Sequence, residues 1–112
     1  MTDDADQCLL VLTNLPDRET ALKLAQSLIG KRLAACVNVL DGCTSVYRWQ
    51  EEVQTDAEVP VLIKTCASRF VPLKDEILAS HPYELPEVIA LPVEAGHEPY
   101  LAWVRAEVDI SG

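Results

Sequence analysis

The spacing of apolar residues along the chain predicts strands and helices in alternation. Residues 7–13 form a short apolar run typical of a buried strand. Residues 17–30 carry apolar side chains at helical spacing behind a capping Asp17. Residues 34–49 are rich in β-forming residues around the turn-forming pair Asp41-Gly42. The first half of the chain is therefore predicted as a strand, a helix and one long β stretch that this turn interrupts.

The second half repeats this pattern in a shorter form. Polar residues 50–56 predict a connection, and residues 58–66 predict a second long strand. A helix is expected to begin at Ser68 and to end before His81-Pro82. Residues 87–93 predict the last strand, and residues 98–108 a short terminal helix.

The resulting order, β-α-β-β-α-β with an added C-terminal helix, predicts an α+β fold of the ferredoxin-like type. Two helices are expected on one face of a four-stranded antiparallel sheet. The chain has 112 residues, which is enough for one domain over residues 1–112 and too few for two. Residues 1–6 are expected to form a flexible tail.

The length of the segment 34–49 conflicts with the size of such a domain. At about 3.3 Å per residue it extends roughly 50 Å, whereas the diameter of the globule is only about 35 Å. The segment must bend at Asp41-Gly42 or project as a long hairpin. A projecting hairpin exposes Val46, Tyr47 and Trp49 together with unpaired backbone groups. Pairing between hairpins of neighbouring copies would bury these side chains and pair these backbone groups. This predicts a homo-oligomer of cyclic symmetry.

Net charge excludes two classes of partner. The formal charge is −9, and binding to nucleic acid or to an anionic membrane requires a surplus of Lys and Arg. The acidic residues 1–6 do not resemble a signal peptide, and no apolar run approaches the roughly 20 residues that span a bilayer. A soluble, cytoplasmic protein is expected.

The chain contains no motif for nucleophilic, phosphate-binding or zinc-protease chemistry. No enzymatic activity and no organic cofactor are therefore expected. Metal binding is the chemistry that the residues do suggest.

His81 and Cys36 are the candidate metal ligands. A neutral imidazole binds copper and zinc well, and the alternative is a helix-terminal histidine that interacts with the helix dipole. A Cys36 thiolate would favour Cu(I), and the alternative is a buried thiol in the core. Glu84 and Glu87 either add oxygen ligands or solvate the loop.

Several segments, in this order, resemble the CutA family of divalent-cation-tolerance proteins. They are Lys31-Arg32-Leu33-Ala34-Ala35-Cys36-Val37-Asn38-Val39, Thr44-Ser45-Val46-Tyr47-Arg48-Trp49, Glu58-Val59, Leu62-Ile63-Lys64-Thr65, His81-Pro82-Tyr83-Glu84-Leu85-Pro86-Glu87 and Tyr100-Leu101-Ala102-Trp103. The match extends from about Leu12 to Val104. Because several segments match together, the resemblance is far more specific than any one of them.

The resemblance implies a ferredoxin-like fold similar to that of PII signalling proteins, assembled as a homotrimer through long hairpins. It also implies a cytoplasmic role in tolerance of copper and other divalent cations, without catalysis. His81 and Cys36 match a histidine and a cysteine of the family. Some relatives carry a further histidine at the position of Ser80 and a cysteine at that of Thr13. Hydroxyl groups are poor ligands for soft metals, so weak metal binding is expected.

Two other functions are compatible with the same fold. One is a PII-like signalling module that binds a small molecule between subunits, and the other is a structural or anchoring trimer without a ligand. Three departures from the family pattern concern the fold itself. Glu51 replaces a usual Gly at the hairpin tip, Pro60 interrupts a predicted strand, and Pro72 is expected to weaken the first turn of the second helix.

Overall fold

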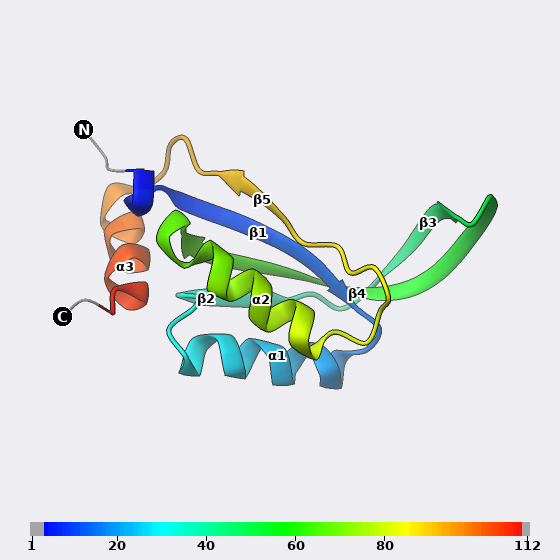
Figure 1. Ribbon diagram of the computed structural model, residues 1–112. Coiled ribbons are helices and arrows are strands. Elements are labelled where there is room, and N and C mark those ends of the chain that lie inside the picture. Colours follow the sequence, from blue (N-terminus) through cyan, green and yellow to red (C-terminus); the bar gives the residue numbers. More distant parts are fainter. Residues whose placement is uncertain (1–3, 111–112) are drawn as a thin grey trace.

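The computed structural model describes residues 4–110, with the chain folded as an antiparallel sheet and three helices (Figure 1). Its α+β, ferredoxin-like architecture confirms the predicted class. The elements in order are β1 (Cys8–Leu15), α1 (Arg18–Gly30), β2 (Cys36–Val39), β3 (Cys43–Trp49), β4 (Glu52–Cys66), α2 (Phe70–Ser80), β5 (Ile89–Pro92) and α3 (Glu98–Val108). Of the expected tail, Asp4–Asp6 form a 3-10 turn, and residues 1–3 lie outside the described residues.

β4 is the strand on which the sheet is built. It pairs with β1 along its second half and on its other side with β2 and β3 in succession, while β5 pairs with β1. All of these pairings are antiparallel, and the strand order is β2-β4-β1-β5. Every sheet contact of β2 and β3 therefore depends on this one strand.

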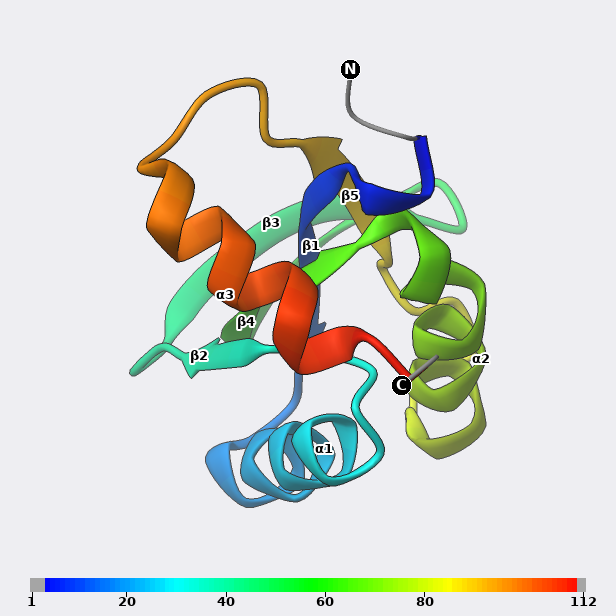
Figure 2. The ribbon, with the colours of Figure 1, turned by 90° about the vertical axis from the view of Figure 1, so that its left-hand side faces the viewer.

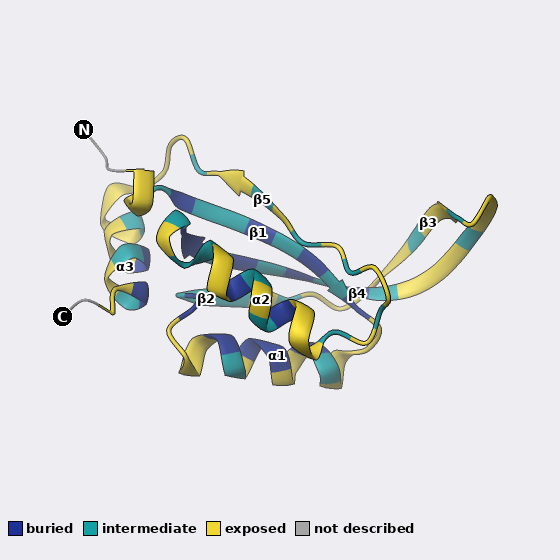
Figure 3. Cartoon of the chain, viewed as in Figure 1, coloured by how far each residue is buried: buried dark blue, intermediate teal, exposed yellow. Residues whose placement is uncertain are grey.

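The two faces of the sheet are covered differently. α1 and α2 pack on one face, and α3 lies across the other face at one end (Figure 2). Successive side chains of a strand point to opposite faces, and burial alternates accordingly along β1 and the second half of β4 (Figure 3). The main core comprises Val11, Leu15, Val61 and Ile63 of the sheet with Leu24, Leu28, Leu73 and Ile77 of the helices. A smaller cluster under α3 contains Cys8, Cys66, Val104 and Val108.

The hairpin of β3 and β4 projects beyond the sheet, and the described chain measures 46 × 26 × 23 Å (Figure 1). β2 ends at Val39 and β3 begins at Cys43, so the chain bends at the expected place, Asp41-Gly42. It also projects as a hairpin, so both of the expected solutions occur. The prediction of a polar connection over residues 50–56 was wrong, because β4 already begins at Glu52 and runs for 15 residues. Those polar side chains belong to a solvated strand, which alternation of apolar residues does not reveal.

The hairpin turn consists of Gln50 and Glu51 alone. Trp49 pairs with Glu52 across it, and both turn residues have positive φ angles, 51° and 70°. Two-residue hairpin turns of this type favour Asn and Gly because other side chains are strained there. The structure thus accommodates Glu51 in the left-handed conformation where relatives usually carry glycine.

Neither proline disturbs its element. The carbonyl of Pro60 accepts from the Leu40 amide at 3.0 Å, and since the N and O of a strand residue face the same neighbour, its missing N–H lies at the break after β2. A 3-10 turn at Ala67–Arg69 leads into α2, which begins at Phe70, so Pro72 is the third residue of that helix. The first amides of a helix have no intrahelical acceptor, so the missing N–H of Pro72 removes no hydrogen bond from within the helix.

Thr13 and Thr65 offer a matched test of the core. Both are at most 1% exposed. The Thr65 hydroxyl donates to the Leu33 carbonyl at 2.7 Å, whereas the Thr13 hydroxyl has no hydrogen-bond partner among the described residues. Thr13→Val is expected to raise the free energy of unfolding by about 1 kcal/mol, and Thr65→Val to lower it by about 1–3 kcal/mol. Urea denaturation of both variants measures this, and a destabilised Thr13→Val protein would contradict it.

Candidate functional site

A groove of about 910 Å³ lies between the projecting hairpin and the connection from α2 to β5. Three aromatic side chains line it, together with four carboxylates. They are Tyr47, Trp49 and Tyr83, with Asp56, Glu58, Glu84 and Glu87. The hairpin supplies one wall and residues 82–87 supply the other.

His81 anchors the second wall to the sheet. The amide of Tyr83 donates to His81 Nδ1 at 3.1 Å, so Nδ1 is an acceptor and the ring proton lies on Nε2. Nε2 is 2.7 Å from the Asn14 carbonyl oxygen of β1 and donates to it. The imidazole is thus neutral, with both nitrogens engaged. It also packs against the Tyr83 ring, at 4.6 Å between centroids.

Cys36 lies at a different place on the sheet. It is half-buried on β2, where its Cα pairs with that of Lys64, and its thiol is 3.9 Å from Asn38 Oδ1. Asn14, the partner of His81, pairs with Pro60, which is about 13 Å from Lys64 along β4 at the usual rise per residue. The structure therefore does not bring the two predicted ligands together.

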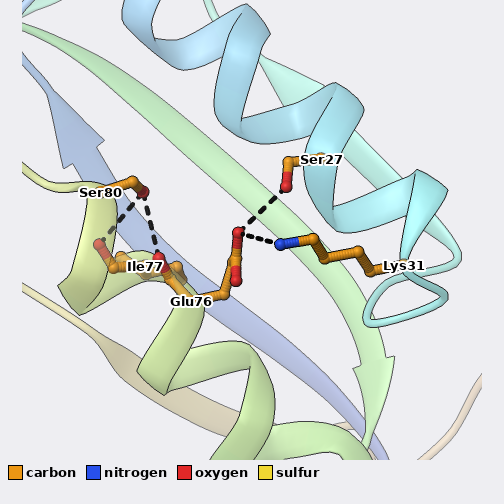
Figure 4. Close-up of polar contacts among 5 residues, drawn as sticks. All are labelled: Ser27, Lys31, Glu76, Ile77 and Ser80. Atoms are coloured by element: carbon orange, nitrogen blue, oxygen red, sulfur yellow. Dashed lines mark hydrogen bonds and ion pairs between the residues drawn. The ribbon is translucent and has the colours of Figure 1, made fainter.

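The remaining candidate positions do not complete a metal site either. Ser80 turns its hydroxyl back to the carbonyls of Glu76 and Ile77, at 3.1 and 3.4 Å (Figure 4). Thr13 points into the main core. Within residues 4–110 no three His, Cys, Asp or Glu side chains are grouped to hold a metal ion. The residues present do not fit a resident, multidentate metal centre.

Figure 4 also shows what holds the end of α2 in position. Glu76 accepts hydrogen bonds from Ser27 Oγ at 3.1 Å and Lys31 Nζ at 2.8 Å of α1. The hydrogen bond from Lys31, and secondly that from Ser27, lowers the pKa of Glu76. These contacts join the two helices just before the chain reaches His81.

Two phenol–carboxylate pairs line the groove, and the sequence analysis did not find them. The Tyr47 hydroxyl donates to Asp56, and Tyr83 hydrogen-bonds to Glu58. The bond to Asp56 raises the pKa of Tyr47; burial, and then the bond to Glu58, raises that of Tyr83 to about 12. Tyr47 and Asp56 lie diagonally across the hairpin, because the direct partner of Asp56 is Ser45, two residues before Tyr47. The hairpin register was the signal that could have predicted it.

Comparison with known proteins identifies the family. A family model described as CutA1 divalent ion tolerance protein matches residues 9–107. The chain belongs to the CutA1 family. The divalent-cation tolerance protein CutA of Thermus thermophilus is 47% identical over 96 residues, covering 86% of this chain and 93% of that protein. The crystal structure of CutA1 from Oryza sativa superposes with a TM-score of 0.90 at 40% identity, covering 97% of this chain and 100% of that one.

Family membership leaves the compartment open. A CutA protein of Arabidopsis thaliana, 44% identical over 87% of this chain and 53% of its own length, is named as chloroplastic. No helix within residues 4–110 is long and apolar enough to cross a membrane. The CutA1 family is named for ion tolerance and not for an enzymatic activity. The cytoplasmic location expected from the sequence stays a prediction.

The raised pKa of Tyr83 predicts a pH dependence of stability. Between its usual pKa near 10 and the folded value of about 12, the phenol ionises in the unfolded chain but not in the folded one. Its contribution to stability is complete below about pH 10 and is lost as the pH rises to about 12. The free energy of unfolding is expected to fall less steeply over this range in Tyr83→Phe than in the parent. Equal slopes in urea denaturation series would contradict this.

Proposed function

We propose that this CutA1-family chain acts in divalent-cation tolerance as a homotrimer that binds metal ions weakly. The observation that carries the proposal is an apolar sheet face that the chain itself leaves open. Weak binding is inferred from the separation of the two candidate ligands.

The open face lies opposite α1 and α2. By strand alternation it contains Leu10 and Leu12 of β1, Leu62 of β4, and Ile89 and Leu91 of β5. Ile89 and Leu91 are 51% and 49% exposed. α3 covers only the end of this face, next to Cys8 and Cys66. A contiguous apolar surface of this kind is typical of a protein–protein interface.

The projecting hairpin supplies a second contact surface. Val46 and Val53 are 66% and 63% exposed on it, and β3 pairs only with β4, so its outer edge presents free backbone groups. Two different surfaces on one chain allow each copy to contact the next head to tail, and such contacts close into a ring. The number of three copies is inferred from the resemblance to trimeric relatives.

Leu91→Glu is expected to convert a trimer into monomers at micromolar concentration, because it places a charge among the apolar side chains of the open face. Leu78→Glu is the matched control, since Leu78 is 46% exposed but lies on α2. Sedimentation equilibrium of the parent and both variants measures the assembly. A parent chain that sediments as a monomer would refute the trimer, and dissociation by both variants would refute the assignment of the face.

Metal binding is proposed to use His81 and Cys36 as separate single donors. A metal ion at His81 must displace the hydrogen bond to either Asn14 or Tyr83, and one at Cys36 must displace the thiol hydrogen bond to Asn38 Oδ1. A single ligand binds far more weakly than a chelating set.

Anaerobic titration of the reduced protein tests this. Cu(II) is expected to bind no tighter than about micromolar, a free energy of about −8 kcal/mol, and more weakly in His81→Ala. Cu(I) binding is expected to weaken in Cys36→Ala. His97→Ala and Cys43→Ala are the matched controls for imidazole and thiol. Binding that neither His81→Ala nor Cys36→Ala alters would contradict the assignment.

A further inference from the structure

Cys8 and Cys66 face each other directly across β1 and β4, at the end of the sheet that α3 covers. Their Cα atoms are register partners. The adjacent amide of Ala67 donates to the Gln7 carbonyl at 2.9 Å. The Cys8 carbonyl instead accepts from Val93, on the β5 side, at 2.9 Å. Hydrogen-bonded and non-hydrogen-bonded pairs alternate along an antiparallel ladder, so the Cys8–Cys66 pair is of the non-hydrogen-bonded type.

This type of pair has the spacing that a disulfide needs. Its Cα atoms lie about 4.5 Å apart, inside the range of about 4.4–6.8 Å over which two cysteines can be joined. Cys8 also lies close enough to Cys66 to contribute to the raised pKa of the Cys66 thiol. All four cysteines are free, but Cys36 is paired with Lys64 and Cys43 with Glu58. The register thus selects one pair.

The pair packs against apolar side chains, with the cation of Arg105 beside Cys8 and the carboxylate of Asp6 near Cys66. Cys8 and Cys66 are 4% and 2% exposed and pack against Val104 and Val108 of α3. Arg105 Nη1 lies 3.8 Å from Cys8 Sγ, so a negative charge on that sulfur has a positive charge beside it. Burial raises the pKa of the Cys66 thiol to about 12, which keeps this side chain a neutral thiol at neutral pH.

A small oxidant can reach the Cys66 side of the pair. Cys66 lines a surface hollow of about 390 Å³, which is bordered by Ser68 on one side and by Arg105 and Val108 of α3 on the other. This hollow is distinct from the groove at the hairpin. It admits a molecule of the size of hydrogen peroxide without any displacement of the sheet.

We propose that Cys8 and Cys66 form a redox-active dithiol, which hydrogen peroxide oxidises to a disulfide across β1 and β4. One thiolate attacks peroxide, the O–O bond breaks, and a sulfenic acid and hydroxide form. The second thiol then attacks the sulfenic sulfur, which forms the S–S bond and releases water. In total two thiols lose two electrons and two protons, and peroxide is reduced to two molecules of water. The inference does not rest on the proposed trimer or on metal binding.

The apolar cluster favours this product over a metal bound by the same two sulfurs. A disulfide is uncharged, whereas two thiolates with a bound metal ion place separated ionic charges among Val104 and Val108. Oxidation also removes the Cys8 S–H that donates to the Leu101 carbonyl at 3.8 Å. The contact of α3 with the sheet therefore differs between the reduced and oxidised forms, and Trp103 lies on that helix.

The test uses the full chain with Cys36→Ser and Cys43→Ser, which retains only the proposed pair. After exposure to hydrogen peroxide, titration of thiols under denaturing conditions is expected to show the loss of both thiols per chain. Peptide mass spectrometry is expected to find Cys8 bonded to Cys66 within one chain, and dithiothreitol is expected to restore both thiols. Trp103 fluorescence is expected to change with oxidation and to return on reduction.

The same chain with Cys66→Ala added is the matched control, and it is expected to form no intrachain bond. Two thiols that stay free under conditions that oxidise the exposed Cys43 of the parent would overturn the proposal. Bonds found only between chains, or oxidation to sulfinic acid without a disulfide, would overturn it as well. Since the main measurement keeps both cysteines, it does not depend on the folding of the control.

Discussion

The structure depends on the pairing of β4, because this strand is longer than the sheet to which it belongs. Its second half lies between β1 and β2 and forms the centre of the domain. Its first half has left the sheet and retains only β3 as a neighbour. Backbone groups of a strand must be paired with protein or with water, so the projecting half forms a hairpin with one free edge. The projecting hairpin, the groove beside it and the proposed assembly all follow because β4 is longer than the sheet.

The two faces of the sheet show how burial is divided within one chain. α1 and α2 bury one face completely, with Val11, Val61 and Ile63 at zero exposure. α3 is too short to bury the other face and covers only the Cys8–Cys66 end. The uncovered apolar residues on β1, β4 and β5 are therefore the natural contact of another copy. The thiol pair is buried under α3, and a hollow between that helix and Ser68 reaches Cys66.

The groove is a case in which hydrogen bonding competes with metal binding. An imidazole is a good ligand for copper and zinc only while one nitrogen is free, and both nitrogens of His81 are used to fix the loop at residues 82–87. The carboxylates of Asp56 and Glu58 similarly accept bonds from Tyr47 and Tyr83. Residues whose chemistry suggests a metal site thus serve to hold the projecting hairpin and the loop at residues 82–87 in position. Cys36 is kept apart from them by the geometry of the sheet.

The sequence by itself determined the element order, the antiparallel sheet with two helices on one face, and the family. These follow from local periodicity and from short motifs, which act within a few residues of each other. From the length of residues 34–49 it also predicted a hairpin that projects from the domain, since the length of an extended segment is set by residue count alone. The start of β4 at Glu52 was not predicted, because a strand with water on both faces has no alternation to read.

Only the tertiary structure decided which distant side chains meet. His81 and Cys36 share a metal preference, but the register of β1, β2 and β4 places them at different positions along the sheet. Cys8 and Cys66 have no motif in common, and the same register sets them opposite each other. Chemical type is a property of single residues, whereas proximity across 58 positions of chain depends on how the strands pair, which no local pattern encodes.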